Sequence, residues 1–300
     1  MRSGFVSFVG RPNAGKSTLV NRLVGAKVAI VSDKPQTTRN RILAVKHRPD
    51  GQLVILDTPG IHRPLHRMNV RMVDAALDTL REVDVLVLVT DASEKAGHGD
   101  RYVLEIVRHA RTPVILALNK IDLVAKPRLL PVMASYGAGD VFADIVPVSA
   151  ATGDGVERLE DLVVQRLPEG DPLYPEDYLT DQPERVMAAE MIREKLLQHT
   201  GDELPFTTAV TIDQFEEPAA PGGLLKLFAT IFVERTSQKP IVIGRAGAMI
   251  KRIGTEARQE LERLFATKVF LDLHVKVKAD WREDERLLDE LGVPRRRRDR

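Results

Sequence analysis

The sequence predicts two domains, an α/β domain with a mainly parallel sheet followed by a small α+β domain. Apolar runs of strand length alternate with helical patterns over the first 167 residues. A segment with several prolines and no periodicity follows, and beyond it the pattern changes to a helix, two strands, helices and a further strand. A chain of 300 residues fits two domains of ~100–200 residues each.

The first domain, residues 1–170, begins with an apolar run that predicts a strand at 5–9. Similar runs predict strands at 53–57, 84–90, 113–119 and 144–150. Helical patterns lie between them, for example at 69–83, 100–111 and 155–167. The run at 41–47 is joined to the strand at 52–57 by Arg48-Pro-Asp-Gly51, a turn sequence that predicts a hairpin and therefore one antiparallel strand.

Beyond the first domain, residues 171–183 are predicted to be a proline-rich linker. The second domain, residues 184–291, is predicted to begin with a helix that includes Pro183 near its first turn. Its other predicted elements are strands at 207–215 and 224–235, a strand just before Gly244, a helix from there to about 266, a strand at 268–279 and a short helix at 281–291. Residues 292–300 are predicted to be a basic tail.

Composition and charge exclude several classes of protein. The chain contains no cysteine, which excludes disulfides, thiolate metal sites and cysteine nucleophiles and fits a reducing compartment. The longest apolar runs, such as 85–89, are strand-sized and too short to span a bilayer. We therefore expect a cytosolic protein.

The net charge of +1 conceals a strong asymmetry along the chain. Residues 171–217 contain twelve Asp or Glu and three Lys or Arg, whereas residues 225–282 contain twelve Lys or Arg and six Asp or Glu. A basic C-terminal part of this kind predicts a surface that binds a polyanion.

Residues 10–18 read GRPNAGKST and follow the first predicted strand directly. The spacing Gly10-x-x-x-x-Gly15-Lys16-Ser17 is typical of a phosphate-binding loop, because glycines let several N–H groups converge and the following helix presents its positive end to an anion. Lys16 is expected to reach the outer phosphates, and the Ser17 hydroxyl to bind magnesium. The other loop residues expected to contact a nucleotide are Gly10, Arg11, Pro12, Asn13, Ala14, Gly15 and Thr18.

Asp57-Thr58-Pro59-Gly60 follows a second predicted strand. An aspartate at the carboxyl end of a parallel strand can hold magnesium through water, and a glycine there lets a backbone N–H approach a terminal phosphate. At this distance after a phosphate-binding loop, the four residues are expected to contact the nucleotide and its metal ion.

Asn119-Lys120-Ile121-Asp122 follows a third predicted strand and is expected to bind a purine base. The Asp122 carboxylate can accept hydrogen bonds from N1–H and the 2-amino group of guanine, which adenine cannot donate. Asn119 is expected to bridge the base and the phosphate-binding loop, and the Lys120 stem to cover the base. Ser149-Ala150, at the end of the last strand, can brace Asp122 and donate an N–H to the guanine oxygen.

These four motifs, in this order and each at a strand end, are the signature of a GTPase domain. With PQTTRN at 35–40 and IGRAG at 243–247, they make the chain similar to the Era family of bacterial GTPases over essentially its whole length. The resemblance implies a P-loop GTPase domain joined to a KH domain of type II. It also implies that the protein assists assembly of the small (30S) ribosomal subunit through the single-stranded 3′ region of 16S rRNA.

The resemblance carries expectations about partners and location as well. GTP or GDP with Mg²⁺ is the expected ligand, and we expect a cytoplasmic monomer. Peripheral association with the inner face of the cell membrane is left open, since the sequence contains no evident amphipathic anchor.

By the same resemblance, residues 27–41 form a switch segment in which Thr38 closes on magnesium and the γ-phosphate, with Thr37 as the alternative. The expected metal residues are therefore Ser17, Thr38 and Asp57. Such segments are ordered by the γ-phosphate and released on hydrolysis.

The sequence departs from Ras at the residue after Gly60, where Ile61 stands near the position at which Ras has a water-orienting glutamine. We therefore expect slow intrinsic hydrolysis, with Lys16, Thr38 and Gly60 contributing by position and charge. Asn13 is placed where related GTPases recruit a potassium ion. The alternative is that Asn13 only stabilises the turn of the loop.

In the second domain, Ile243-Gly244-Arg245-Ala246-Gly247 contains a GxxG turn of the kind that clamps a single RNA strand in KH domains. Lys251 and Arg252 are expected to add positive charge to this clamp. The alternative is a glycine turn in an ordinary α+β domain with a solvated basic face. Trp281 is predicted to pack in the core rather than stack on a base, and the arginines at 295–298 to attract phosphate nonspecifically.

The sequence favours a GTPase whose nucleotide state gates binding to RNA and the ribosome. One alternative is a GTPase that acts in RNA modification, although no second catalytic centre is visible. The other is an RNA-binding assembly factor that holds a nucleotide with little or no turnover, which Ile61 leaves open.

Overall fold

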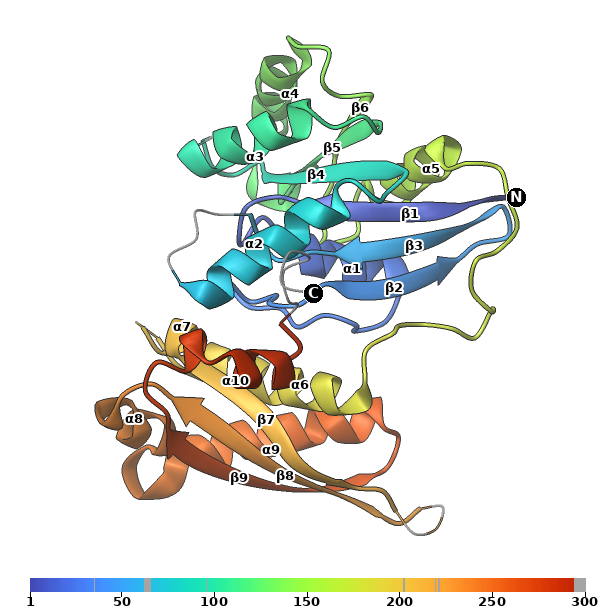
Figure 1. Ribbon diagram of the computed structural model, residues 1–300. Helices are drawn as coiled ribbons and strands as arrows, with labels where there is room; N and C mark the ends of the chain where they lie inside the picture. Colours follow the sequence, from blue (N-terminus) through green and yellow to red (C-terminus); the bar gives the residue numbers. More distant parts are fainter. Residues whose placement is uncertain are drawn as a thin grey trace.

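The computed structural model describes residues 1–34, 36–61, 66–95, 97–201, 203–218, 220 and 222–293. These residues form two sheets, each with its own helices, which lie one above the other in Figure 1. Among them, no helix is both long and apolar enough to cross a membrane.

The N-terminal domain is built on a six-stranded sheet in the order β2-β3-β1-β4-β5-β6. All neighbouring strands are parallel except β2, which is antiparallel to β3. This confirms the predicted hairpin and the mainly parallel sheet. The strands are β1 (Arg2–Val9), β2 (Ile42–His47), β3 (Gly51–Asp57), β4 (Val85–Asp91), β5 (Val114–Asn119) and β6 (Asp144–Pro147).

Helices cover both faces of this sheet, so its central strands are buried and almost wholly apolar. One core joins the sheet to α1 (Lys16–Val24) and α5 (Val156–Arg166), and the other lies on the side of α2 (Arg67–Thr79), α3 (His98–Arg108) and α4 (Leu129–Gly137). Two short 3-10 turns, η1 (Ile121–Leu123) and η2 (Lys126–Arg128), precede α4. α4 carries little signal in the sequence, because none of its residues is buried and a proline stands in its first turn.

The C-terminal domain is built on a three-stranded sheet in which β8 pairs antiparallel with β7 and parallel with β9. Residues of α6 and α9 pack with the sheet in a separate core. The elements are α6 (Glu184–His199), α7 (Leu204–Thr207), β7 (Thr208–Glu216), β8 (Leu224–Val233), η3 (Thr236–Gln238), α8 (Lys239–Ile243), η4 (Arg245–Gly247), α9 (Ala248–Leu264), β9 (Lys268–Val277), η5 (Trp281–Glu283) and α10 (Glu285–Glu290).

The predicted architecture, an α/β domain with a mainly parallel sheet followed by a small α+β domain, is confirmed by this element order and sheet topology. The domain boundaries at 170, 183 and 291 stay predictions. Most of the predicted basic tail lies outside the described residues, which end at 293 before the final arginines.

One predicted element is wrong. The apolar residues before Gly244 form the short helix α8 rather than a strand. Pro240 lies in its first turn, where the fixed φ of proline favours a helix, and Val242 is fully buried while Ile241 is exposed. A run of three apolar residues fits either structure, so periodicity alone could not decide between them.

The linker is held against the N-terminal sheet rather than extended away from it. Val45 N donates to Leu179 O at 2.8 Å, and the Thr180 hydroxyl donates to Leu43 O at 2.6 Å. An isolated antiparallel bridge joins Ala44 to Thr180. These residues cover the free edge of β2, which would otherwise present unpaired backbone groups.

The two domains share a small apolar core beside α2. Met68 and Met72 of α2 cluster with Trp281, Leu287 and Leu288 of the C-terminal domain. Trp281 is fully buried, and its indole N–H donates to Thr207 O at 2.9 Å. This confirms the prediction that Trp281 packs in the core.

Candidate functional site

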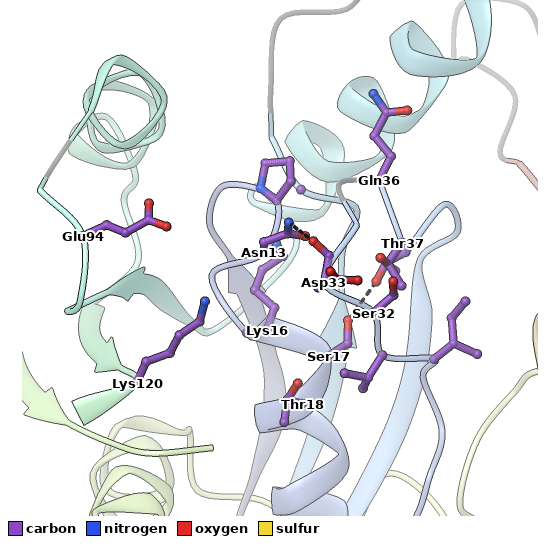
Figure 2. Close-up of a pocket in the computed structure, with 16 residues that line it drawn as sticks. Asn13, Lys16, Ser17, Thr18, Ser32, Asp33, Gln36, Thr37, Glu94 and Lys120 are labelled. Atoms are coloured by element: carbon purple, nitrogen blue, oxygen red, sulfur yellow. Dashed lines mark hydrogen bonds between the residues drawn. The ribbon is translucent and has the colours of Figure 1, made fainter. Parts of the chain in front are cut away.

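The carboxyl ends of β1, β3 and β5 meet at one edge of the N-terminal sheet and bring three of the predicted motifs together. A cavity of about 400 Å³ lies beside the loop at 10–18. In Figure 2, Lys120 and Glu94 lie on one side of this cavity and the segment that carries Asp33 and Thr37 on the other. The lining residues are Pro12, Asn13, Gly15, Lys16, Ser17, Thr18, Ile30, Val31, Ser32, Asp33, Gln36, Thr37, Thr38, Gly60, Glu94 and Lys120.

The loop at 10–18 needs its glycines for geometry. Gly15 has a φ of 93°, and a Cβ on it would lie 2.2 Å from Nδ2 of Asn119. The Lys16 ammonium bends back over the loop and donates to Gly10 O at 3.2 Å and Arg11 O at 2.9 Å. Burial lowers the pKa of Lys16 to about 8, so the side chain still carries a positive charge at neutral pH.

The three residues predicted to hold a metal ion converge behind this loop. Ser17 Oγ lies 2.7 Å from Asp57 Oδ2 and 2.8 Å from Thr38 Oγ1. Asp57 is fully buried, and burial raises its pKa to about 6. Its Oδ1 has no hydrogen-bond partner among the described residues. A cluster of oxygen donors with one unpartnered carboxylate oxygen fits the hard ion Mg²⁺.

The two candidate threonines of the switch segment have different surroundings. Thr38 is almost fully buried, with its hydroxyl against Ser17. The Thr37 hydroxyl instead donates to Lys34 O at 2.6 Å. The geometry therefore supports Thr38 rather than Thr37 as the residue that faces the metal site.

The buried side-chain amide of Asn119 joins its own motif at 119–122 and the Ser149-Ala150 motif to the phosphate-binding loop. Asn119 Nδ2 donates to Ala14 O, and its Oδ1 accepts from Ala150 N, both at 2.9 Å. Asn119 thus fixes the relative position of the phosphate-binding loop and the turn that follows β6. The expected contact with Ala14 is present, and the contact with Ala150 adds a link that the sequence did not suggest.

Asp122 is braced as the sequence suggested, since the Ser149 hydroxyl donates to its Oδ1 at 2.6 Å. Lys120 has a left-handed backbone with a φ of 67°, and its ammonium lies 2.6 Å from Asp91 Oδ2. Burial alone would raise the pKa of Asp91, but hydrogen bonds from Lys120 and Ser93 hold it below its ordinary value. Asp91 therefore anchors the lysine stem that is expected to cover the base.

Gly60 and Ile61 are fixed close to the phosphate-binding loop. A Cβ on Gly60 would lie 2.7 Å from Pro12 N, and Ile61 N donates to Gly10 O at 3.1 Å. The Ile61 side chain is buried in the core rather than turned to the cavity. The Thr58 hydroxyl donates a hydrogen bond to Phe8 O in β1 at 3.0 Å. Pro59 follows Thr58 and precedes Gly60.

Asn13 and Arg11 tie the loop to its neighbours. Asn13 has a φ of 63°, and its Nδ2 donates to Asp33 O at 2.6 Å across the cavity mouth. Arg11 pairs with Glu94 and, at 3.2 Å, with Asp100. Sequence reasoning missed Asp33, Asp91 and Glu94. Asp91 alone had a signal, since it is the polar residue that ends the apolar strand β4.

The GxxG turn lies on the surface of the C-terminal domain between α8 and α9. Gly244 has a φ of 75°, and a Cβ on it would lie 2.6 Å from Cβ of Met249, whereas a Cβ on Gly247 would meet open space. Arg245 and Ala246 are exposed, and Ile243 packs against the core of the domain. Lys251 is exposed in the first turn of α9, and Arg252 pairs with Glu256 at 3.1 Å.

The fold and the site together define a P-loop GTPase joined to a KH domain. The family model described as a 50S ribosome-binding GTPase matches residues 5–120, and the KH domain model matches residues 203–282. Over 291 residues, covering 97% of both chains, this chain is 52% identical to GTPase Era of Geobacter metallireducens. It is 53% identical, with the same coverage, to GTPase Era of Geotalea uraniireducens. The chain belongs to the Era family of GTPases, as its motifs predicted.

Solved structures of Era agree with this assignment along the whole chain. The crystal structure of Era in complex with MgGDPNP and nucleotides 1506-1542 of 16S ribosomal RNA matches with a TM-score of 0.94 and 39% identity, covering 98% of this chain and 100% of that one. A variant of Aquifex aeolicus Era bound to GDP.AlF4- matches with a TM-score of 0.93 at the same identity and coverage.

Proposed function

We propose that the cavity beside the loop at 10–18 binds GTP with Mg²⁺, and that the bound nucleotide controls RNA binding by the C-terminal domain. The binding of GTP with Mg²⁺ is supported above all by the convergence of three side chains. Thr38 Oγ1 and Asp57 Oδ2 lie 2.8 Å and 2.7 Å from the Ser17 hydroxyl oxygen. These residues come from three separate segments: the start of α1, the switch segment and the end of β3.

In the proposed reaction, water attacks the γ-phosphorus, the bond to the β–γ bridging oxygen breaks, and GDP and inorganic phosphate leave. We infer that the buried positive charge of Lys16 lies beside the outer phosphates and that the Gly60 N–H approaches the terminal phosphate. Magnesium, held through Ser17, Thr38 and Asp57, would neutralise phosphate charge. Because Ile61 is buried, catalysis depends on position and electrostatics, and intrinsic turnover is slow.

The base is read by Asp122, with Lys120 over the ring and Asn119 holding the base motif against the loop. The support is the pair of fixed contacts behind it, Ser149 to Asp122 and Asp91 to Lys120. These contacts preorganise both side chains, so little conformational freedom is lost when guanine binds.

Potassium is part of this proposal. The Asn13 side chain lies at the cavity mouth with Nδ2 turned to Asp33 O, which directs its Oδ1 away from that carbonyl. An amide oxygen beside the phosphates is a suitable ligand for a monovalent cation. The same hydrogen bond equally supports the simpler role, in which Asn13 stabilises the loop turn.

For RNA, we propose that the GxxG turn and the start of α9 bind the single-stranded 3′ region of 16S rRNA. The support is an exposed turn with open space at Gly247 and the exposed cations Arg245 and Lys251 beside it. The relative solved with nucleotides 1506-1542 of 16S ribosomal RNA supplies the choice of ligand. The biological setting we propose is assembly of the small ribosomal subunit, with the chain acting as a cytoplasmic monomer and any membrane association peripheral.

The proposed switch function is tested by phosphate release from GTP, measured with the full chain in the presence and absence of small ribosomal subunits. Slow release that changes when subunits are added is the expected result. Release that is immeasurable under both conditions would leave a protein that holds nucleotide without turning it over.

A further inference from the structure

Two residues of the switch segment, Val31 and Thr37, are each held by one of two consecutive residues of α6. Glu194 Oε1 accepts a hydrogen bond from Val31 N at 2.8 Å, and Arg193 Nη2 donates to Thr37 O. Both side chains are buried, with 2% and 1% of their surface exposed. Since α6 belongs to the C-terminal domain, residues of this domain hold part of the cavity wall that the N-terminal domain provides.

Each of the two α6 side chains is itself fixed. Glu194 Oε2 lies 2.5 Å from the ammonium of Lys27 and 3.1 Å from that of Lys195. Arg193 Nε donates to Glu190 Oε1 at 2.7 Å. Buried charged groups with several partners have little freedom to move. We call Arg193 and Glu194 the α6 clamp.

The α6 clamp holds the residue that directly precedes Thr38, the residue that faces the proposed metal site. Thr38 follows the clamped carbonyl of Thr37 directly, and its hydroxyl lies 2.8 Å from Ser17 Oγ. On its other side, the buried Arg39 guanidinium donates to Thr208 O at 2.8 Å and Pro205 O at 3.2 Å. Thr38 is therefore flanked on both sides by backbone or side-chain contacts to the C-terminal domain.

We propose that Arg193 and Glu194 are positioning residues for GTP hydrolysis, which hold Thr38 in place for the metal ion and the γ-phosphate. Neither side chain is among the described residues that line the cavity, and both act through their contacts with the backbone of Val31 and Thr37. Displacements of about 1 Å in a catalytic group can cost up to ~100-fold in rate, so loosening this segment should slow the reaction. The proposal rests on the proposed role of Thr38.

The test is single-turnover GTP hydrolysis by the full chain as a function of Mg²⁺ concentration, with GDP affinity measured on the same proteins. Arg193→Met and Glu194→Met remove the contacts at similar length. We expect both to slow hydrolysis by at least about tenfold and to raise the Mg²⁺ requirement. GDP affinity should stay unchanged, because the γ-phosphate that orders the switch segment is absent from GDP.

Conservative and control variants separate positioning from general damage. Arg193→Lys and Glu194→Gln each retain one donor or acceptor, so they should lose less than the methionine variants, and they carry the test if a methionine variant does not fold. Arg185→Met changes an exposed arginine of the same helix and should behave like the unsubstituted chain. Thermal unfolding midpoints establish that the compared proteins are folded.

A double-mutant cycle with Thr38→Ala gives the decisive result. If the α6 clamp acts through Thr38, adding Arg193→Met to Thr38→Ala should slow hydrolysis little further. Independent losses, or unchanged hydrolysis in folded clamp variants, would overturn the proposal. Thr38→Ala alone tests the underlying assignment: if it leaves the Mg²⁺ requirement unchanged, the metal role of Thr38 fails, whereas an effect of Thr38→Ala without any effect of the clamp variants refutes only the clamp.

Discussion

At the scale of single residues, the proposed recognition of the base depends on a carboxylate whose orientation is set by its neighbours. Asp122 Oδ1 accepts the Ser149 hydroxyl at 2.6 Å, and the turn around Ser149 is tied to Asn119 through Ala150. The base motif is thus one connected unit with the phosphate-binding loop, since Asn119 also reaches Ala14. We expect a substitution of one of these residues to change the specificity for the base more than the stability of the fold.

Asp122→Asn should weaken GTP binding and strengthen binding of xanthosine triphosphate. An amide donates where the carboxylate accepts, and xanthine presents the complementary oxygen. Buried polar groups left unpaired cost about 1–3 kcal/mol, so we expect a loss of at least about tenfold for GTP. Titration of both nucleotides measures it, with Asp140→Asn, an exposed carboxylate after α4, as the control. Unchanged GTP affinity in Asp122→Asn would remove the base-reading role.

Ser17→Ala should impair magnesium-dependent hydrolysis and leave the fold intact. The Ser17 hydroxyl is the centre of the contacts to Thr38 and Asp57, and the sheet does not use it. We expect a higher Mg²⁺ requirement and at least about a tenfold slower rate, with an unfolding midpoint close to that of the unsubstituted chain. The metal assignment is wrong if Ser17→Ala hydrolyses GTP fully with an unchanged metal requirement.

Potassium should accelerate GTP hydrolysis relative to sodium at equal ionic strength. Asn13 offers an amide oxygen at the cavity mouth, and the buried Ile61 offers no polar group. Asn13→Ala should abolish the difference between the two salts. Equal rates in potassium and sodium, or a potassium effect that survives in Asn13→Ala, would instead support the purely structural role of this residue.

At the scale of helices, strands and turns, much of the fold was predictable because strands and motif positions are local features. Each apolar run in the first domain became a strand, and the polar residues that follow β1, β3 and β5 met at one sheet edge, as parallel topology requires. The Arg48-Pro-Asp-Gly51 turn likewise placed β2 antiparallel to β3.

Other elements were set by contacts between distant residues, which periodicity cannot show. The helical conformation of α8 buries the Val242 side chain in the core. The linker lies against the N-terminal sheet because Leu179 and Thr180 form hydrogen bonds with the free edge of β2. The clamp residues Arg193 and Glu194 carried no signal either. On a helix of mixed composition, buried charges look like ordinary surface charges until their partners 156 and 163 residues away are known.

The GxxG turn is the element on which RNA binding should depend. Arg245→Asp combined with Ala246→Asp places two negative charges where phosphates should pass and removes one cation. We expect at least about a tenfold loss of affinity for a single-stranded oligonucleotide of the 16S rRNA 3′ region, a weaker salt dependence, and unchanged GTP affinity. Binding titrations on the same protein measure all three.

A suitable control reverses a charge elsewhere in the domain. Arg185 is exposed near the start of α6, and the contacts of His199 with Glu256 and of Lys195 with Glu260 show that α6 runs antiparallel to α9. Arg185 is therefore far from the turn, and Arg185→Asp should change RNA affinity little. If the double variant at 245 and 246 keeps its RNA affinity, the turn does not bind RNA and is an ordinary glycine turn of the domain.

At the scale of the whole molecule, the two domains meet through the parts of the N-terminal domain that we propose respond to the nucleotide. The switch segment contacts α6 and, through Arg39, Pro205 of α7 and Thr208 at the start of β7. Arg71 of α2, the helix that follows the Gly60 segment, donates to Asp289 at 3.0 Å and to Val293 O at 3.2 Å. Lys27 also pairs with Glu260 of α9, the helix that begins at the GxxG turn.

We expect this arrangement to make the interface between the domains sensitive to the nucleotide. Burial lowers the pKa of Arg39 to about 9, with the nearby charge of Arg193 acting in the same direction. The buried Arg193 guanidinium is paired with Glu190, and its charge opposes that of the buried Arg39 guanidinium nearby. An interface of this kind is expected to open when the γ-phosphate no longer orders the switch segment.

Gating of RNA binding by the nucleotide state is tested by titrating the full chain with a single-stranded oligonucleotide of the 16S rRNA 3′ region in the presence of Mg²⁺. The titration is run once with GDP and once with a non-hydrolysable GTP analogue. Coupling between two sites is typically worth about 5–150-fold in affinity, so we predict at least about fivefold tighter RNA binding with the analogue. Equal affinities in the two nucleotide states would contradict the account.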